Sequence, residues 1–189
     1  EKALGDYKAQ APLTMITGTR TREGQATPEI ISLKGKRLAV LQEATRKTVL
    51  NEGTFKEYTG GDTITGRRLY GSDMVSFKPM FNMILCTNDL LEIRSTDNGT
   101  WRRIRVVDFE SQFVHKPNSP EFESIPNVYK RDDNLDSRFD EWAPIFISML
   151  VKIVFKTKGK VNDVDKVLSA SRQYRDKQDY FSKFMKEKI

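Results

Sequence analysis

Two apolar segments of this sequence each end in polar side chains that could act together on a phosphate. Segment 36–43 (KRLAVLQE) ends in Glu43, and segment 80–89 (MFNMILCTND) ends near Asn88. Such short apolar runs are typical of buried strands, and parallel strands present their carboxyl ends to a ligand. A carboxylate beside an amide can orient a water and contact a phosphate, as nucleotide hydrolysis requires. The alternative is that Glu43 and Asn88 only cap the strand ends.

Two adjacent arginines, Arg102 and Arg103, could stabilise developing negative charge. They follow an Asn-Gly pair, which predicts a tight turn, and they precede an apolar run over 104–109 that predicts a strand. A rigidly held arginine can reach the γ-phosphate bound by a neighbouring subunit. Since adjacent strand residues point to opposite faces, we expect at most one of the two to do so. The alternative is a solvated pair on an exposed strand.

A glycine-rich stretch, residues 60–71, also combines charge with an aromatic ring. It contains four glycines together with Arg67, Arg68 and Tyr70. The flanking patterns predict a helix that stops at Gly60 and a hairpin with its turn near residue 70. Charge and a flat ring near a hairpin tip suit phosphate contact and base stacking without sequence preference. The alternative is an ordinary surface hairpin whose charges provide solubility.

The order of the predicted elements indicates an α/β fold followed by helices. We expect a parallel sheet core with a projecting hairpin over 1–112, an acidic loop over 113–139, and a helical subdomain over 140–189. Apolar residues at helical spacing predict an amphipathic helix over 141–155. Segment 180–188 predicts a further short helix.

The charge, the few cysteines and histidines and the lack of long apolar runs limit the kinds of partner and site that this protein can have. The chain has 189 residues, a net charge of +6 and an isoelectric point near 9.3, which favours a polyanionic partner. One cysteine, Cys86, excludes an internal disulfide and favours a reducing compartment. With one histidine, His115, a zinc site is not expected. No apolar run reaches the roughly 18 residues of a membrane span, and we expect no membrane partner.

Four segments together resemble one helicase family. They occur in order and at close spacing: LKGKRLAVLQE (33–43), FKEYTGGDTITGRRLYG (55–71), FKPMFNMILCTND (77–89) and DNGTWRRIRVVDF (97–109). The set resembles the superfamily 3 helicases of the AAA+ class, specifically the primase-helicases of poxviruses, giant DNA viruses and related phages. The segments correspond to the Walker B strand, the B′ motif, the sensor 1 strand and the arginine-finger segment.

The resemblance implies ATP and Mg²⁺ as cofactors. Glu43 matches the Walker B acid that helps to hold the metal and polarises the attacking water. Gln42 stands where some members have a second acid, so metal binding would depend more on Glu43 and on residues outside this chain. Asn88 matches the sensor 1 amide.

The resemblance also implies a ring of subunits, most simply a hexamer. Arg103 matches the arginine finger best, with Arg102 second. Lys56 falls where relatives place a basic residue that contacts the nucleotide on the adjacent subunit. Such residues act only across a subunit boundary.

In relatives the glycine-rich region leads into a hairpin that grips single-stranded DNA in the central channel. On that basis Arg67, Arg68 and Tyr70 would contact DNA. Gly66 and Gly71 would keep the hairpin mobile or tightly bent.

One motif of the family is absent from these 189 residues, namely the phosphate-binding loop GxxxxGK[ST]. We expect the chain to begin just after that loop and to be inactive as an ATPase by itself. The parent protein would be a replicative helicase, in some relatives joined to a primase, acting in the host cytoplasm or in the bacterial cytoplasm if it is from a phage. The alternative is a non-catalytic, basic DNA-binding or scaffold module derived from such an ATPase.

Overall fold

The computed structural model describes residues 2–19, 25–70 and 73–179. The chain divides into two compact units. The sheet unit consists of Leu4–Ile104 and Arg172–Ile189, and the helical unit consists of Glu1–Ala3 and Arg105–Ser171.

This division differs from the boundaries predicted after residues 112 and 139. The chain leaves the sheet unit after Ile104 and returns to it at Arg172, within helix α6 (Asp165–Gln178). A contact between residues distant in sequence accompanies this return, because the Tyr174 hydroxyl donates a hydrogen bond to the carbonyl of Leu91. Local sequence patterns contain no sign of such a contact.

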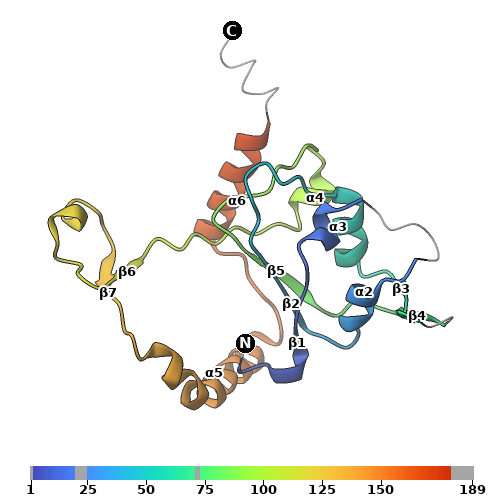
Figure 1. The fold of residues 1–189 in the computed structure, drawn as a ribbon, viewed down its shortest axis with the longest axis horizontal. Coiled ribbons are helices and arrows are strands. Elements are labelled where there is room, and N and C mark those ends of the chain that lie inside the picture. Colours follow the sequence, from blue (N-terminus) through green and yellow to red (C-terminus); the bar gives the residue numbers. More distant parts are fainter. Residues whose placement is uncertain (1, 20–24, 71–72, 180–189) are drawn as a thin grey trace, which may run out of the picture. The chain divides into compact units, whose positions relative to one another are not determined.

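A three-stranded parallel sheet lies at the centre of the sheet unit (Figure 1). Its strands are β1 (Lys8–Gln10), β2 (Leu38–Gln42) and β5 (Asn82–Cys86), in the order β1-β2-β5. Strand β2 is central, and its residues Ala39, Val40 and Leu41 are buried, as the apolar run predicts. The parallel pairing brings all three carboxyl ends to one edge of the sheet.

Strand β5 forms as predicted, but it is not buried. Exposed and half-buried residues alternate along it, and Ile84 is 48% exposed. Since successive strand residues point to opposite faces, the alternation shows that one face of β5 is more exposed than the other. In addition, no strand within the described residues pairs with its outer edge. An apolar run predicts a strand but does not distinguish a central strand from an edge strand.

Short helices complete the sheet unit. They are η1 (Gly5–Tyr7), α1 (Thr14–Thr17), α2 (Pro28–Ser32), α3 (Glu52–Thr59) and α4 (Asn98–Trp101). Helix α3 begins where the Asn51 side chain accepts from the N–H of Thr54 at 3.2 Å. It ends at Gly60, and Gly61 follows with a φ of 84°. The predicted helix stop at this glycine pair is therefore confirmed.

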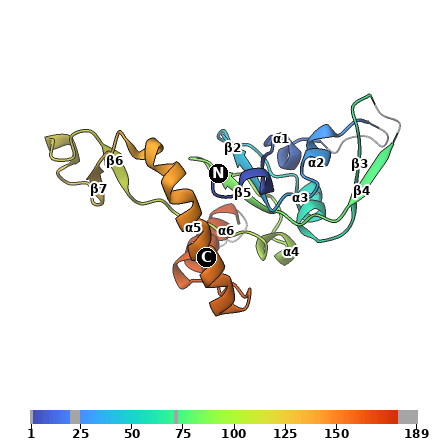
Figure 2. The same ribbon diagram turned by 90° about the horizontal axis from the view of Figure 1, so that it is seen from below.

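Strands β3 (Ile64–Arg67) and β4 (Met74–Phe77) form the predicted antiparallel hairpin. Figure 2 shows the hairpin extending away from the sheet. The end of β3 that leads into the turn is attached to Thr27, the residue preceding α2, by two hydrogen bonds. The N–H of Thr27 donates to the carbonyl of Arg67 at 2.9 Å, and the N–H of Arg67 donates to Thr27 Oγ1 at 3.0 Å.

Gly66 allows close packing of β3 against α2. A Cβ atom at this buried position would lie 2.9 Å from Thr27 Oγ1 and 3.0 Å from Ile31 Cγ1. Glycine therefore lets β3 approach α2 closely, while the expectation that Gly66 keeps the hairpin mobile or tightly bent stays a prediction. Gly71 lies outside the described residues.

The helical unit contains a small parallel strand pair and long helices. Its elements are β6 (Gln112–Val114), η2 (Pro120–Phe122), β7 (Val128–Lys130), α5 (Leu135–Thr157) and the first half of α6. Strand β6 pairs with β7, so the predicted acidic loop 113–139 has regular structure within it. The short helix predicted over 180–188 lies outside the described residues.

Helix α5 is longer than the predicted segment 141–155 and includes Pro144. Its amphipathic pattern predicts a buried apolar face, yet none of its residues is buried; Phe146, for example, is 51% exposed. Nothing in the described part of its own unit covers that face. Of the helices in the described ranges, none is both long and apolar enough to cross a bilayer.

The strand predicted over 104–109 is absent. In place of a strand ladder, the N–H of Val106 donates to Ser171 Oγ at 2.9 Å. Arg105 forms two bonds to the Asp163 carboxylate, at 2.6 and 2.9 Å. Side chains of the α6 region therefore replace strand neighbours, and this part of the prediction is wrong.

Gly66→Ala should lower the free energy of unfolding by about 1–3 kcal/mol, because the added methyl group overpacks the contact between β3 and α2. Urea denaturation followed by circular dichroism measures the change. Gly53→Ala is the matched control: in α3 an added Cβ meets Asn51 Oδ1 at 3.5 Å, which is ordinary contact. It should be neutral or stabilising by up to about 1 kcal/mol. Equal destabilisation by both changes would contradict the packing role of Gly66.

Candidate functional site

Glu43 directly follows the central strand of the sheet. Strands β2 and β5 are parallel neighbours with Gln42 opposite Cys86, and the N–H of Glu43 donates to the carbonyl of Cys86 at 3.3 Å. Asn88 follows β5 two residues later. The acid and the amide thus follow neighbouring parallel strands, as the sequence predicts, and both side chains are exposed.

The backbone at Glu43 turns sharply out of the strand. Its φ is 65°, in the left-handed region that few residues other than glycine adopt. Strained conformations of this kind occur preferentially at functional sites. The turn directs the chain away from β2 at the residue for which the sequence predicts chemistry.

A shallow cavity of about 260 Å³ lies at the carboxyl ends of β1 and β2. Its lining consists of Gln10, Ala11, Pro12, Leu13, Gln42 and Glu43. Gln10 Nε2 donates to Gln42 Oε1 at 3.4 Å, so the amide of Gln42 is oriented by the neighbouring strand. Asn88 does not belong to this lining.

The donor set at this edge can assist Mg²⁺ but cannot enclose it. Glu43 offers one carboxylate, and Gln10 and Gln42 offer amide oxygens, which are suitable ligand atoms for this ion. Within the described ranges, no three side chains of His, Cys, Asp or Glu gather into a metal cage. The residues therefore fit a Mg²⁺ ion held mainly by substrate phosphates.

The two predicted finger arginines follow a single helical turn rather than beginning a strand. Asp97 caps α4, because its Oδ1 accepts from the N–H of Gly99 at 3.0 Å. Arg102 ends the turn and is exposed, while the half-buried Arg103 donates from Nη1 to the carbonyl of Gly99. The argument that the two point to opposite faces of a strand therefore fails. Residues 95–103 are called the arginine loop below.

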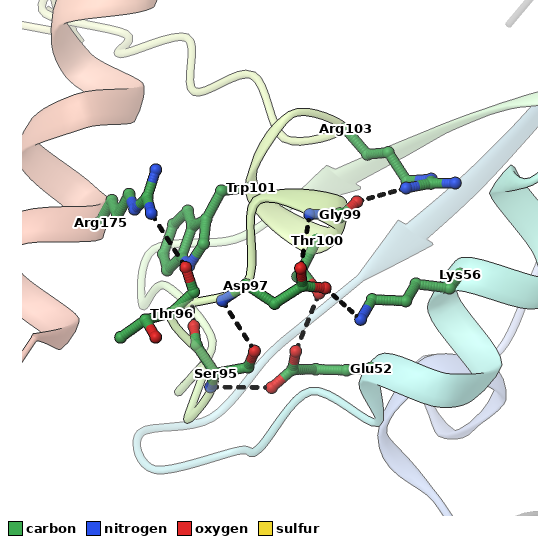
Figure 3. Close-up of polar contacts among 10 residues, drawn as sticks. All are labelled: Glu52, Lys56, Ser95, Thr96, Asp97, Gly99, Thr100, Trp101, Arg103 and Arg175. Carbon is green, nitrogen blue, oxygen red and sulfur yellow. Dashed lines mark hydrogen bonds and ion pairs between the residues drawn. The ribbon is translucent and has the colours of Figure 1, made fainter.

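Helix α3 holds the arginine loop with two side chains four positions apart, Glu52 and Lys56 (Figure 3). The Glu52 carboxylate accepts from the N–H of Ser95 at 2.9 Å and from the Thr100 hydroxyl at 2.8 Å. Thr100 is completely buried, so its hydroxyl depends on this acceptor. Residues at this spacing share one face of a helix, so α3 presents both groups to the loop.

Lys56 forms an ion pair with Asp97. Lys56 Nζ lies 2.5 Å from Asp97 Oδ2, and the two side chains are 38% and 49% exposed. The hydrogen bond from Lys56, aided by the N–H of Gly99, holds the pKa of Asp97 below its ordinary value. The structure thus brings the predicted Lys56 to the loop that contains Arg102 and Arg103.

Helix α6 holds the other side of the arginine loop (Figure 3). The Trp101 and Tyr174 rings meet edge to face, with centroids 5.2 Å apart. Arg175 Nη2 donates to the carbonyl of Thr96 at 2.9 Å. Within the loop, Trp101 Nε1 donates to the carbonyl of Ser95 at 2.8 Å. The loop is therefore fixed from both sides by elements of the sheet unit.

The three predicted DNA-contacting residues differ in exposure. Arg67 is half-buried, and its backbone is bonded to Thr27. Arg68 and Tyr70 are exposed, Tyr70 completely. Arg68 and Tyr70 are therefore the members of this set that a DNA strand could reach most easily.

Sequence reasoning missed several residues around the candidate sites. Gln10 lies in a strand of only three residues, which gives almost no pattern. The spacing of Glu52 and Lys56 and the Asp-Asn-Gly triplet at 97–99 were visible signals, of a helix face and of a helix cap. No local signal indicated that Tyr174 reaches Leu91.

Comparisons with known proteins agree on one group of relatives. No protein-family model matches the sequence. The chain is 33% identical over 188 residues to "Putative helicase L207/L206" of Acanthamoeba polyphaga mimivirus and 31% identical over 195 residues to "Putative helicase 022R" of Frog virus 3. These matches cover 96% and 100% of this chain.

The chain is related to one segment of the helicases and primases named in large DNA viruses. A third relative, "Putative primase C962R" of African swine fever virus, is 28% identical over 195 residues. The chain spans about a fifth of the length of these relatives, 19% of the mimivirus protein and 20% of the other two. The family likeness read from the four sequence segments is thereby supported for a viral helicase or primase.

Tyr174 should make stability fall at alkaline pH. Burial raises the pKa of its hydroxyl well above the ordinary value of about 10. Above about pH 10 the tyrosine of the unfolded chain loses its proton, while the buried tyrosine of the folded chain keeps it. The free energy of unfolding should therefore fall by up to about 1.4 kcal/mol per pH unit. Urea denaturation between about pH 8 and pH 11 measures the slope.

Tyr174→Phe is the control for this slope. It removes the titrating group and the bond to Leu91, so it should lower stability near neutral pH by about 1 kcal/mol and flatten the alkaline decline. Parallel pH curves for the two proteins would contradict the assignment to Tyr174.

Proposed function

We propose that this chain is part of the ATPase core of a DNA helicase that acts in the replication of a large DNA virus. The observation that supports this best is the edge of the parallel sheet, where Glu43 lines a cavity and follows a strand adjacent to the one before Asn88. The whole-chain similarity to proteins with helicase and primase names supports the same reading. In this proposal the enzyme hydrolyses ATP and moves along single-stranded DNA.

The strand-end residues would position the reactants for hydrolysis. Glu43 would orient the attacking water and contribute one ligand to Mg²⁺, with Gln42 beside it. Asn88, on the neighbouring strand end, would contact the transferred phosphate. Positioning and charge stabilisation account for most of the catalysis in phosphoryl transfer, and Mg²⁺ would supply charge neutralisation of the phosphates.

The arginine loop and Lys56 would act on a nucleotide bound by a neighbouring subunit. Arg103, held at the end of α4, would be the finger, with Arg102 second in line. This role requires a ring of subunits, and a hexamer is the arrangement that we propose. The loop is fixed by α3 and by α6, and rigid placement is what such a group needs.

The hairpin β3–β4 would face the DNA strand. Arg68 would contact phosphate, Tyr70 would stack on a base, and Arg67, at the turn end of β3, would add positive charge. Hydrolysis around the ring would move the hairpins along the strand. A primase region elsewhere in the same protein fits the name of one relative.

One alternative is favoured by a specific observation. A glutamine precedes Glu43, where a second acid would strengthen metal binding. A non-catalytic DNA-binding or scaffold module would not need that acid. Activity of the full-length protein distinguishes the two functions.

Glu43→Gln should reduce DNA-stimulated ATP hydrolysis by the full-length protein at least about 100-fold, because the group that orients the water loses its charge. Binding of a fluorescent ATP analogue should change little. Glu121→Gln, an exposed acid in the helical unit, should retain full activity. A well-folded wild-type protein without ATPase activity would favour the non-catalytic module.

Arg68→Ala should weaken binding of single-stranded DNA and reduce the salt slope by about 0.7, the value for one lost phosphate contact. Adding Arg67→Ala should flatten the slope further. Tyr70→Ala should cost about 1–3 kcal/mol of binding energy at constant salt slope, and Tyr70→Phe should retain binding because the ring remains. Fluorescence anisotropy across a salt series measures both the DNA affinity and its salt slope. A slope unchanged by the double arginine variant would contradict the DNA role of the hairpin.

A further inference from the structure

The contact between Lys56 and Asp97 links the two elements that the proposed function assigns to one neighbouring nucleotide. Lys56 is on α3, and Asp97 is on the arginine loop, 41 positions further along the chain. The same aspartate caps α4 through the N–H of Gly99, and Arg103 donates to the carbonyl of that glycine. One carboxylate therefore contacts the lysine directly and the arginine through a single residue (Figure 3).

We propose that Asp97 is a positioning residue that holds Lys56 and Arg103 as one preformed pair of cations for the triphosphate of a neighbouring copy. The inference rests on the proposed function and adds to it a residue for which the sequence gave no role. Asp97 itself would not touch the nucleotide. It would act through Lys56 by charge and through Arg103 by capping the turn that precedes it.

The contacts explain why the lysine needs such a partner. A lysine side chain is long and flexible, and aligning it with the charge that develops on the triphosphate in the transition state costs conformational entropy. An ion pair formed in advance reduces that cost. The ammonium group has three donors, and the bond to Asp97 uses one of them. Lys56 can therefore keep its partner while it donates to a phosphate oxygen.

Exposure indicates that the pair serves function more than folding. Both side chains are more than a third exposed, and exposed ion pairs contribute little to stability. The less exposed carboxylate contacts that hold the loop come from the half-buried Glu52 instead, through Ser95 and the fully buried Thr100. Removing the charge of Asp97 should therefore affect turnover without unfolding the loop.

Asp97→Asn is the sharpest test, because asparagine keeps the capping oxygen for Gly99 while losing the charge that holds Lys56. In the full-length protein, kcat for ATP should fall about tenfold with KM nearly unchanged. The thermal unfolding midpoint should stay the same. Asp97→Ala, which also removes the cap, should lower kcat further. Asp163→Asn, an exposed aspartate in an ion pair of the helical unit, should leave kcat unchanged.

A double variant identifies the route of the effect. In protein that already contains Lys56→Met, Asp97→Asn should cause no further loss of kcat, since its effect acts through Lys56. Independent full losses, or a kcat that is unchanged or raised by Asp97→Asn alone, would overturn the proposal.

The ion pair can be tested without any enzymatic activity, so its failure is distinct from failure of the proposed function. NMR on protein with ¹³C-labelled aspartate side chains should give Asp97 a lowered pKa that rises in Lys56→Met. An Asp97 pKa that does not respond to Lys56→Met would overturn the positioning role. If the wild-type protein has no ATPase activity but the pKa responds, the pair exists and the proposed function fails.

Discussion

The parallel pairing of β2 with β5 is the constraint on which the candidate site depends. Five residue pairs, from Leu38 opposite Asn82 to Gln42 opposite Cys86, fix the register. A slip by one residue would turn every side chain of a strand to the other face. Because both strands run in the same direction, Glu43 and Asn88 leave the sheet at one edge. The bond from Glu43 to the carbonyl of Cys86 extends the pairing one residue beyond β2, to the position where the chain turns.

The arginine loop shows how a short segment gains a fixed shape from longer elements. Its one helical turn is too short to be stable alone, because isolated helices of this length are not favoured in water. Helix α3 supplies a carboxylate and an ammonium group, and α6 supplies Tyr174 and Arg175. The contribution of each contact to stability depends on how deeply the contact is buried. The contacts to buried Thr100 and around Tyr174 stabilise the fold, whereas the exposed pair of Lys56 and Asp97 contributes little to it.

The hairpin combines a glycine required for packing with exposed side chains that are free to meet a ligand. Gly66 is required because α2 approaches the strand closely, while the exposed Arg68 and Tyr70 have no such packing role. Arg67 joins these two regions, since its backbone is bonded to Thr27. A hairpin whose strand β3 packs against α2 and whose turn residues are exposed can present side chains to a ligand without loss of stability. This arrangement places Arg68 and Tyr70 beyond the packed part of β3.

The sequence by itself determined the buried strand β2, the glycine-stopped helix α3, the hairpin and the amphipathic helix α5, because periodicity, caps and glycine positions act within a few residues. It also identified Glu43, Lys56 and the two arginines as candidates. Only the tertiary structure decided that β5 lies at an edge, that Arg102 and Arg103 follow a helical turn, and that Lys56 meets Asp97. It also decided that α6 returns to the sheet unit, where Arg175 bonds a carbonyl 79 positions earlier. Local patterns cannot encode these features, because each depends on which distant segment supplies the partner for a hydrogen bond or an apolar face.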